Sequence, residues 1–194
     1  MGVSATFYFD LASPAAYLAA ERALAVLPGP CAWQPILARA LPAAERYDSY
    51  RDETERLAAR EPIERRAQTL GLQPLVWPTP FPFESEFAML AATFARRIGK
   101  CVPFALAAFR QAFAGGHALS IPEHVLIAGA ACEMHPSAIL RASETRGVRD
   151  ELARASAEAL ELGISDVPAV RIDAQVFVGE QRLEEAGQLL GSRG

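Results

Sequence analysis

The pattern of apolar and polar positions predicts strands only near the two ends of the chain. A short apolar and aromatic run over residues 3–9 predicts a first strand, and the alanine- and leucine-rich stretch 14–26 predicts a helix. After a break rich in proline and glycine, the run 32–37 predicts a second strand. A helix between two nearby strands is typical of a βαβ unit, so we expect these strands to be parallel.

The middle of the chain shows helical spacing and no strand pattern. Helices are predicted over 45–70, 85–99 and 103–113, followed by further helical stretches that end near residue 163. Ser85 is expected to cap the second of these helices. Such a long block cannot be a loop, so it indicates a helical insertion.

Two motifs mark further helix boundaries in this block. Ser120 and Glu123 have the spacing of a capping box and predict the start of a helix between them. His135-Pro136 is expected to end that helix, because proline disfavours helical backbone in the residue before it.

Strand patterns return at the carboxyl-terminal end. The runs 167–172 and 175–178 predict two short strands joined by a turn at Asp173-Ala174, and a last helix is expected to start near Arg182. The order is therefore βαβ, a helical block, then ββα. We predict an α/β protein with a thioredoxin-like sheet.

The two end segments are expected to form one domain. Residues 1–40 and 164–194 are assigned to this thioredoxin-like domain, and residues 41–163 to an all-helical insertion domain.

Composition and charge narrow the functional classes. The chain has 194 residues, 51% hydrophobic and 22% charged, which supports a sizeable core. The net charge is −4 with both signs interleaved, and this disfavours nucleic-acid binding because a basic face is missing. The amino terminus has no signal-peptide pattern and no apolar window is long enough to cross a membrane, so we expect a cytoplasmic protein.

The three cysteines indicate neither a redox motif nor a metal centre. Cys31, Cys101 and Cys132 lie far apart and form no CxxC pair. We therefore expect reduced thiols in a reducing compartment, and no metal site.

The first candidate site lies between the first strand and the first helix. Ser13-Pro14-Ala15-Ala16 stands where a thioredoxin-type fold places its Cys-x-x-Cys motif. In one interpretation Ser13 is only the N-cap of a helix that starts at Pro14. In the other, its hydroxyl and the positive end of the helix dipole also stabilise a thiolate, which another molecule must supply.

Two further candidates lie in the carboxyl-terminal segment. Val167-Pro168 is either an ordinary proline at a strand start or a cis-proline facing Ser13, whose backbone would pair with a peptide ligand. Considered together with Ser13-Pro14, we predict the cis form. Gly179 can expose backbone N–H groups and Arg182 can bind a carboxylate, although both also fit a plain strand-to-helix turn.

An aromatic and proline-rich segment runs from Trp77 to Ser85. It can line an aromatic substrate pocket, but such a segment is more often a stiff linker whose rings pack into the core, and we expect it to combine both uses.

These residues together resemble the 2-hydroxychromene-2-carboxylate isomerase family, a branch of the DsbA-like and kappa-class glutathione transferase group. The opening F-Y-F-D-x-x-S-P and the closing V-P and G-x-x-R-L patterns carry most of the likeness. The matching segments are Phe7 to Leu18, Arg65 to Gly71, Trp77 to Phe83, Phe109 to Phe113 and Val167 to Leu183. Their order and spacing are specific, although no single motif is.

The resemblance implies a glutathione-dependent cis–trans isomerisation of an aromatic 2-oxo acid, such as 2-hydroxychromene-2-carboxylate, in naphthalene-type degradation. It makes glutathione the cofactor, the oxo acid the small-molecule partner, and a homodimer the expected assembly. Ser13 matches the catalytic serine that hydrogen-bonds the glutathione sulfur. The implied cofactor-binding residues are Ser13, Val167, Pro168, Gly179, Glu180, Gln181 and Arg182, and the implied substrate pocket comprises Tyr17, Trp77, Phe83 and Glu84.

Four positions depart from the family's pattern. Ala15 replaces an aromatic residue, Glu84 an asparagine, Asp166 a glycine, and Gln181 the aspartate that accepts the glutathione α-amino group. Glu180 is the candidate replacement for that acceptor.

Three alternatives to the isomerase stay open. A kappa-like transferase would consume glutathione, whereas an isomerase returns it unchanged. A non-catalytic thioredoxin-fold binding protein with a degenerate glutathione site is favoured by Glu84 and Gln181. A dithiol oxidoreductase is least compatible, because Ser13 and Ala16 stand where both sulfurs would be.

Overall fold

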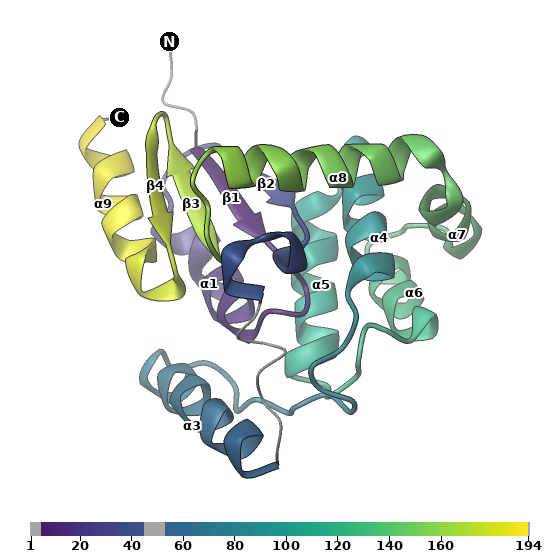
Figure 1. Cartoon of the computed structure of the whole chain (residues 1–194), viewed down its shortest axis with the longest axis horizontal. Coiled ribbons are helices and arrows are strands. Elements are labelled where there is room, and N and C mark those ends of the chain that lie inside the picture. The colour runs from purple at the N-terminus through teal and green to yellow at the C-terminus, as the bar shows by residue number, and fades with distance from the viewer. Residues whose placement is uncertain (1–4, 45–52, 194) are drawn as a thin grey trace.

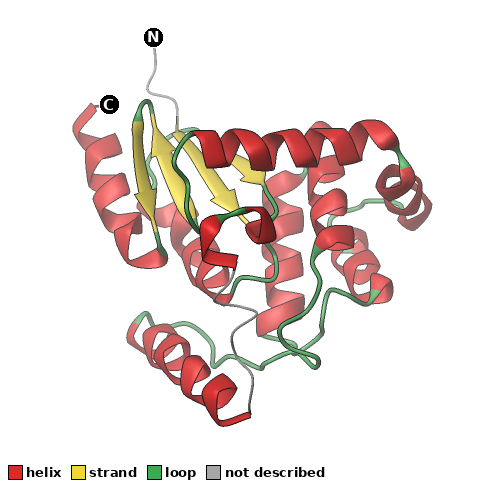
Figure 2. Cartoon of the chain, in the orientation of Figure 1, coloured by secondary structure: helices red, strands yellow, loops and turns green. Residues whose placement is uncertain are grey.

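The computed structural model describes residues 5–44 and 53–193, and its strands form one mixed sheet in the order β2-β1-β3-β4 (Figures 1 and 2). The strands are β1 (Ala5–Phe9), β2 (Cys31–Pro35), β3 (Ala169–Ile172) and β4 (Gln175–Val178). β1 pairs parallel with β2 and antiparallel with β3, and β3 pairs antiparallel with β4. The βαβ unit, the hairpin and the order of elements are confirmed.

The other regular elements of the described chain are helices. The α-helices are α1 (Pro14–Val26), α3 (Glu53–Thr69), α4 (Glu86–Arg97), α5 (Cys101–Phe113), α6 (Pro122–Ala130), α7 (Pro136–Glu144), α8 (Arg146–Glu161) and α9 (Leu183–Arg193). Short 3-10 turns are η1 (Ala38–Ala40), η2 (Pro42–Ala44) and η3 (Glu180–Arg182). The first residues of the predicted strand 3–9 and of the predicted helix 45–70 lie outside the described residues.

Alternation along β1 gives the sheet two buried faces. Phe7 and Phe9 point into the larger core with α1, α4, α5 and α9, whereas Tyr8 points into a smaller core with α8. Figure 1 shows α8 crossing one face of the sheet and α1 lying behind the other. Burial on both faces explains why this strand reads as a continuous apolar run.

The helical middle and the sheet share one hydrophobic core. Phe109 of α5 is fully buried, and its ring centroid lies 5.9 Å from that of Phe9 in β1. All elements between residues 86 and 161 are helical, as the patterning predicts. The division into domains at residues 40 and 164 remains a prediction.

The predicted starts of α4 and α6 are confirmed, but their predicted capping bonds and the predicted end of α6 are wrong. Ser85 is the N-cap residue of α4, but its side chain makes no capping bond. The N-cap of α6 is Ile121, without a side-chain bond, so the predicted capping box of Ser120 and Glu123 is wrong. α6 ends at Ala130, and His135 instead caps the next helix, because a proline after it suits the first helical position.

α9 packs closely on the end of α1 at a glycine. A Cβ built on Gly187 would lie 2.3 Å from the backbone oxygen of Val26, which cannot move aside as a flexible side chain can. On the same helix, a Cβ on Gly191 would meet only a Pro28 carbon at 3.9 Å. The two glycines therefore differ in packing while sharing one helix.

We predict opposite effects for the same substitution at these two glycines. Gly187→Ala should lower the free energy of unfolding by about 1–3 kcal/mol, because overpacking outweighs the gain in helix propensity. Gly191→Ala should be neutral or stabilising by up to about 1 kcal/mol. Urea denaturation measures both, and equal effects of the two variants would contradict the close packing of α9 on α1.

Candidate functional site

Ser13 forms the N-cap of α1 and faces the loop before β3. Its hydroxyl accepts a hydrogen bond from the Ala16 N–H at 3.2 Å and donates to the Val167 carbonyl at 3.4 Å. Pro14 occupies the first turn of the helix, where its missing N–H costs nothing. Ser13 therefore has the capping role expected for it, and it also contacts the second candidate motif.

The Val167–Pro168 peptide bond is cis, as predicted. The Pro168 carbonyl accepts the Gly179 N–H at 2.8 Å, so the loop before β3 lies next to the end of β4. Gly179 has φ 100° and ψ 151°, a conformation that side chains disfavour. Ser13, the cis-proline loop and the Gly179 turn thus meet at one end of the sheet.

Both backbone polar groups of Val167 are engaged within the chain. Its carbonyl accepts from Ser13, and its N–H donates to Asp166 Oδ1 at 2.8 Å. The site is also covered, because Ser13 is 1% and Val167 2% exposed. The hydrogen bond from the Val167 N–H to Asp166 was not predicted, because sequence patterns do not reveal the direction in which the Asp166 side chain points.

Asp10 holds the turn that presents Ser13. Its backbone carbonyl accepts the Ser13 N–H at 3.0 Å, while its carboxylate accepts the Ala12 N–H at 2.9 Å and the Ala38 N–H at 2.8 Å. Burial raises the pKa of Asp10 above its ordinary value, against the opposing effect of these hydrogen bonds. A role for Asp10 in the site was not predicted from the sequence.

Glu180 is a buried carboxylate held by two arginines. Its oxygens accept from Arg22 Nη1 at 2.5 Å, from Arg66 Nε at 2.8 Å and from Arg66 Nη2 at 3.1 Å. Arg22 also pairs with Glu184 of α9. This cluster links α1, α3 and η3, and it was not predicted because its partners are far apart in sequence. The hydrogen bond to Glu180 raises the pKa of Arg66.

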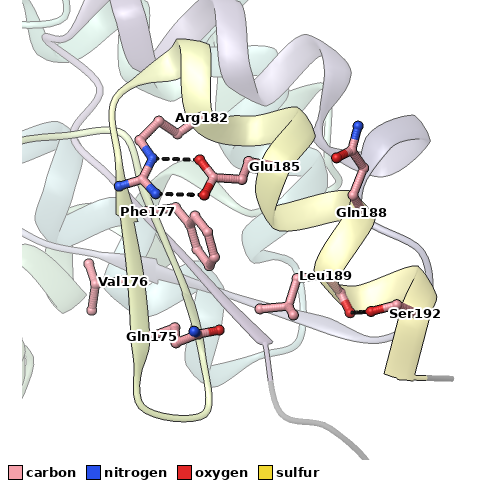
Figure 3. Close-up of a pocket in the computed structure, with 8 residues that line it drawn as sticks. All are labelled: Gln175, Val176, Phe177, Arg182, Glu185, Gln188, Leu189 and Ser192. Carbon is pink, nitrogen blue, oxygen red and sulfur yellow. Dashed lines mark hydrogen bonds and ion pairs between the residues drawn. The ribbon is translucent and has the colours of Figure 1, made fainter.

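Arg182 lies on the other side of the turn, in a separate cavity of about 500 Å³. Its guanidinium makes two 2.8 Å hydrogen bonds to Glu185 and lies 5.0 Å from the Phe177 ring centroid (Figure 3). This cavity between β4 and α9 is lined by Gln175, Val176, Phe177, Arg182, Glu185, Gln188, Leu189 and Ser192. Neither Ser13 nor Pro168 lines it. Gln181 is exposed, and its side-chain amide lies beside Gly179.

Three of the four expected substrate-pocket residues join one aromatic cluster around Phe113. The Phe113 ring centroid lies 5.6 Å from Tyr17, 6.3 Å from Trp77 and 6.5 Å from Phe83. Tyr17 and Phe83 are buried, whereas Trp77 is half-buried. The packing of these rings agrees with the linker interpretation of the segment, whereas the substrate pocket stays a prediction.

Glu84 does not join this cluster. Its side chain is 82% exposed and pairs with Arg39 at 3.1 Å. The outer edge of the cluster instead carries Arg60, whose Cζ lies 5.0 Å from the Trp77 ring centroid, and Glu64, which accepts from the Trp77 indole N–H at 2.5 Å.

The three cysteine thiols are free. Burial raises the pKa of Cys31 to about 11 and that of Cys101 to about 12, so neither carries much thiolate at neutral pH. Within residues 5–44 and 53–193, no group of three or more His, Cys, Asp or Glu side chains is arranged to hold a metal ion.

Comparison with solved structures establishes the fold. A structure of 2-hydroxychromene-2-carboxylate isomerase aligns with a TM-score of 0.81 at 19% identity, covering 97% of this chain and 95% of that one. A probable DsbA oxidoreductase from Streptomyces coelicolor aligns with a TM-score of 0.78 at 19% identity, covering 98% and 89%. The cytosolic disulfide reductase DsbM from Pseudomonas aeruginosa, with GSH, aligns with a TM-score of 0.65 at 13% identity, covering 97% and 96%.

The sequence matches no protein-family model and no curated protein. Among the described helices, none combines the length and apolar character needed to cross a membrane. The structural likenesses confirm the predicted fold class, a thioredoxin-like α/β fold of the DsbA type with a large helical insertion.

The buried cluster around Glu180 gives a stability prediction. Glu180→Gln should lower the free energy of unfolding by about 3 kcal/mol, because it leaves two guanidinium groups around a neutral amide. Glu185→Gln removes the partner of Arg182 at the surface and should leave the urea midpoint nearly unchanged. A similar small effect of both substitutions would show that the cluster does not hold α3 and α1 to the turn.

Proposed function

We propose that this protein is a glutathione-dependent cis–trans isomerase of 2-hydroxychromene-2-carboxylate or a related aromatic 2-oxo acid. The observation that carries the proposal is the Ser13 hydroxyl at the start of α1, facing the Val167 carbonyl across the cis-proline loop. The fold shared with an isomerase of that name and with a reductase studied with GSH supports it.

The surroundings of Ser13 fit the sulfur of glutathione. The 3.4 Å hydrogen bond from its hydroxyl to Val167 is long for an O–H···O contact, so the proton can turn to another acceptor at little cost. The first N–H groups of α1 and the helix dipole favour a negative charge at the same place. When bound, glutathione supplies the thiolate that adds to a conjugated carbon and leaves again.

The other candidate contacts fit glutathione less directly. The N–H of Gly179 already donates to the Pro168 carbonyl at 2.8 Å, so the Gly179 turn would contribute the N–H groups of the residues that follow. Val167, next to the cis-proline, would form the strand-like edge for the peptide. Glu180 is already bound by Arg22 and Arg66, which argues against a free acceptor for the α-amino group there. Gln181 is exposed at the turn and is the group we assign to that contact.

The aromatic substrate is proposed to lie near the cluster of Tyr17, Trp77 and Phe83. Flat rings suit a conjugated aromatic acid, and the half-buried Trp77 marks the accessible edge. Glu84 lies apart from this edge and has no assigned contact with the substrate. The proposal extends, by resemblance, to a cytoplasmic homodimer.

A non-catalytic binding protein is the second candidate, and the closed site favours it. Ser13 and Val167 are almost fully buried, and their polar groups are satisfied within the chain. A kappa-like transferase differs from the isomerase in consuming glutathione, so the glutathione concentration during turnover distinguishes the two.

Substitution of Ser13 tests the proposal. Ser13→Ala should slow the glutathione-dependent isomerisation far more than it weakens glutathione binding, because the peptide part is held elsewhere. A hydrogen bond to a charged group contributes about 1.5–3 kcal/mol, which corresponds to about ten- to a hundredfold in rate. Loss of the N-cap should also cost about 1 kcal/mol of stability.

Ser156→Ala is a matched control for the loss of stability. Ser156 is also a buried serine whose hydroxyl accepts one backbone hydrogen bond, from Leu37 at 2.9 Å, and donates another, to Leu152 at 2.8 Å. Both variants should melt at a lower temperature, but only Ser13→Ala should lose rate. An unchanged isomerisation rate in Ser13→Ala would show that Ser13 acts only as a helix cap.

A further inference from the structure

In the loop before β3, Val167 is the residue next to Ser13 with which a peptide strand could pair. The Pro168 nitrogen carries no hydrogen, and its carbonyl already accepts from Gly179 at 2.8 Å. Ala169 belongs to β3 and lies between Tyr8 and Val178 in the sheet. A ligand that extends the sheet beside Ser13 would therefore use the N–H and carbonyl of Val167.

The side chain of Asp166 occupies one of these two groups. Its Oδ1 accepts the Val167 N–H at 2.8 Å, within the usual range for a good hydrogen bond. The other group, the carbonyl, holds the longer 3.4 Å bond from Ser13. The N–H side of Val167 is therefore held more firmly than the carbonyl side.

A ligand carbonyl is a weaker acceptor than a carboxylate. Hydrogen bonds to an ionised group are roughly twice as strong as those between neutral groups. A peptide that replaces Asp166 at Val167 thus exchanges a charge-assisted bond for a neutral one. The carboxylate must also move out of a half-buried position before the ligand can bind.

We infer that Asp166 is a specificity-determining residue, whose carboxylate competes with the main-chain carbonyl of a peptide ligand for the Val167 N–H. The inference rests on the proposed function, in which that ligand is glutathione. The contact weakens glutathione binding without affecting the capping bond from Ala16 to Ser13. It makes the site selective for ligands that bind Ser13 without strand pairing.

Two variants separate the contact from the charge. Asp166→Ala removes the competing acceptor and should tighten glutathione binding about tenfold or more in calorimetric titration. Asp166→Asn keeps an oxygen acceptor without the charge, so its affinity should fall between those of Asp166→Ala and the wild type. Asp150→Ala is the control for net charge, because Asp150 is exposed on α8 and pairs with Arg146 of the same helix.

Hydrogen exchange of the Val167 amide gives a second measurement that needs no ligand. Without glutathione, this amide should exchange faster in Asp166→Ala than in the wild type, whereas Asp150→Ala should leave its rate unchanged. An unchanged exchange rate in Asp166→Ala would overturn the inference. The melting temperature of each variant is measured as the control for folding.

The titrations test the role of Asp166 separately from the proposed function. Equal glutathione affinity in the wild type and in Asp166→Ala overturns the role of Asp166 and leaves the proposed function standing. Binding that tightens in Asp166→Ala, and to a smaller extent in Asp166→Asn, supports the inference. No binding to the wild type or to any variant overturns the proposed function, and the inference with it.

Discussion

Burial of the Asp10 carboxylate constrains the end of the sheet where the candidate site lies. A buried carboxylate must be hydrogen-bonded, and Asp10 meets this need with N–H groups from the start of the α1 turn and from η1. Its backbone carbonyl holds Ser13 at the same time. One residue therefore fixes the relative positions of β1, the helix start and the chain after β2, and the geometry around Ser13 depends on it.

A similar arrangement secures the opposite side of the site. Glu180 gathers Arg22 and Arg66, so α3 is tied to the thioredoxin-like part although it belongs to the helical middle. The two buried carboxylates differ in their partners. Asp10 is held by backbone N–H groups and by the Ser85 side chain, and burial raises its pKa, whereas Glu180 is paired with two arginines.

The features that could be predicted from the sequence are those with local causes. Apolar runs, the turn at Asp173 and the helix start at Pro14 depend on neighbouring residues, and the structure agrees with them. The cis form of Val167–Pro168 was predicted correctly only because this motif was considered together with the distant Ser13-Pro14. His135-Pro136 was assigned to the wrong side of a helix, because proline suits a first turn as well as it follows a last one.

The polar contacts around the site could not be predicted in the same way. The partners of Glu180 come from two other helices, and no periodicity links them. Asp166 is adjacent to Val167, but its effect depends on a side-chain rotamer that sequence does not specify. The candidate residues could thus be identified from the sequence. Whether their hydrogen-bonding groups already have partners within the chain could be seen only in the structure.

The two tryptophans give the protein two different optical environments. Trp33 is 3% exposed and packs 4.7 Å from Phe7 in the core, whereas Trp77 contacts Arg60 and Glu64 of α3 at the edge of the aromatic cluster. Fluorescence from Trp33 therefore reports on the core as a whole. Fluorescence from Trp77 is sensitive to the position of α3, because the charges of Arg60 and Glu64 on that helix set the electric field across the indole ring.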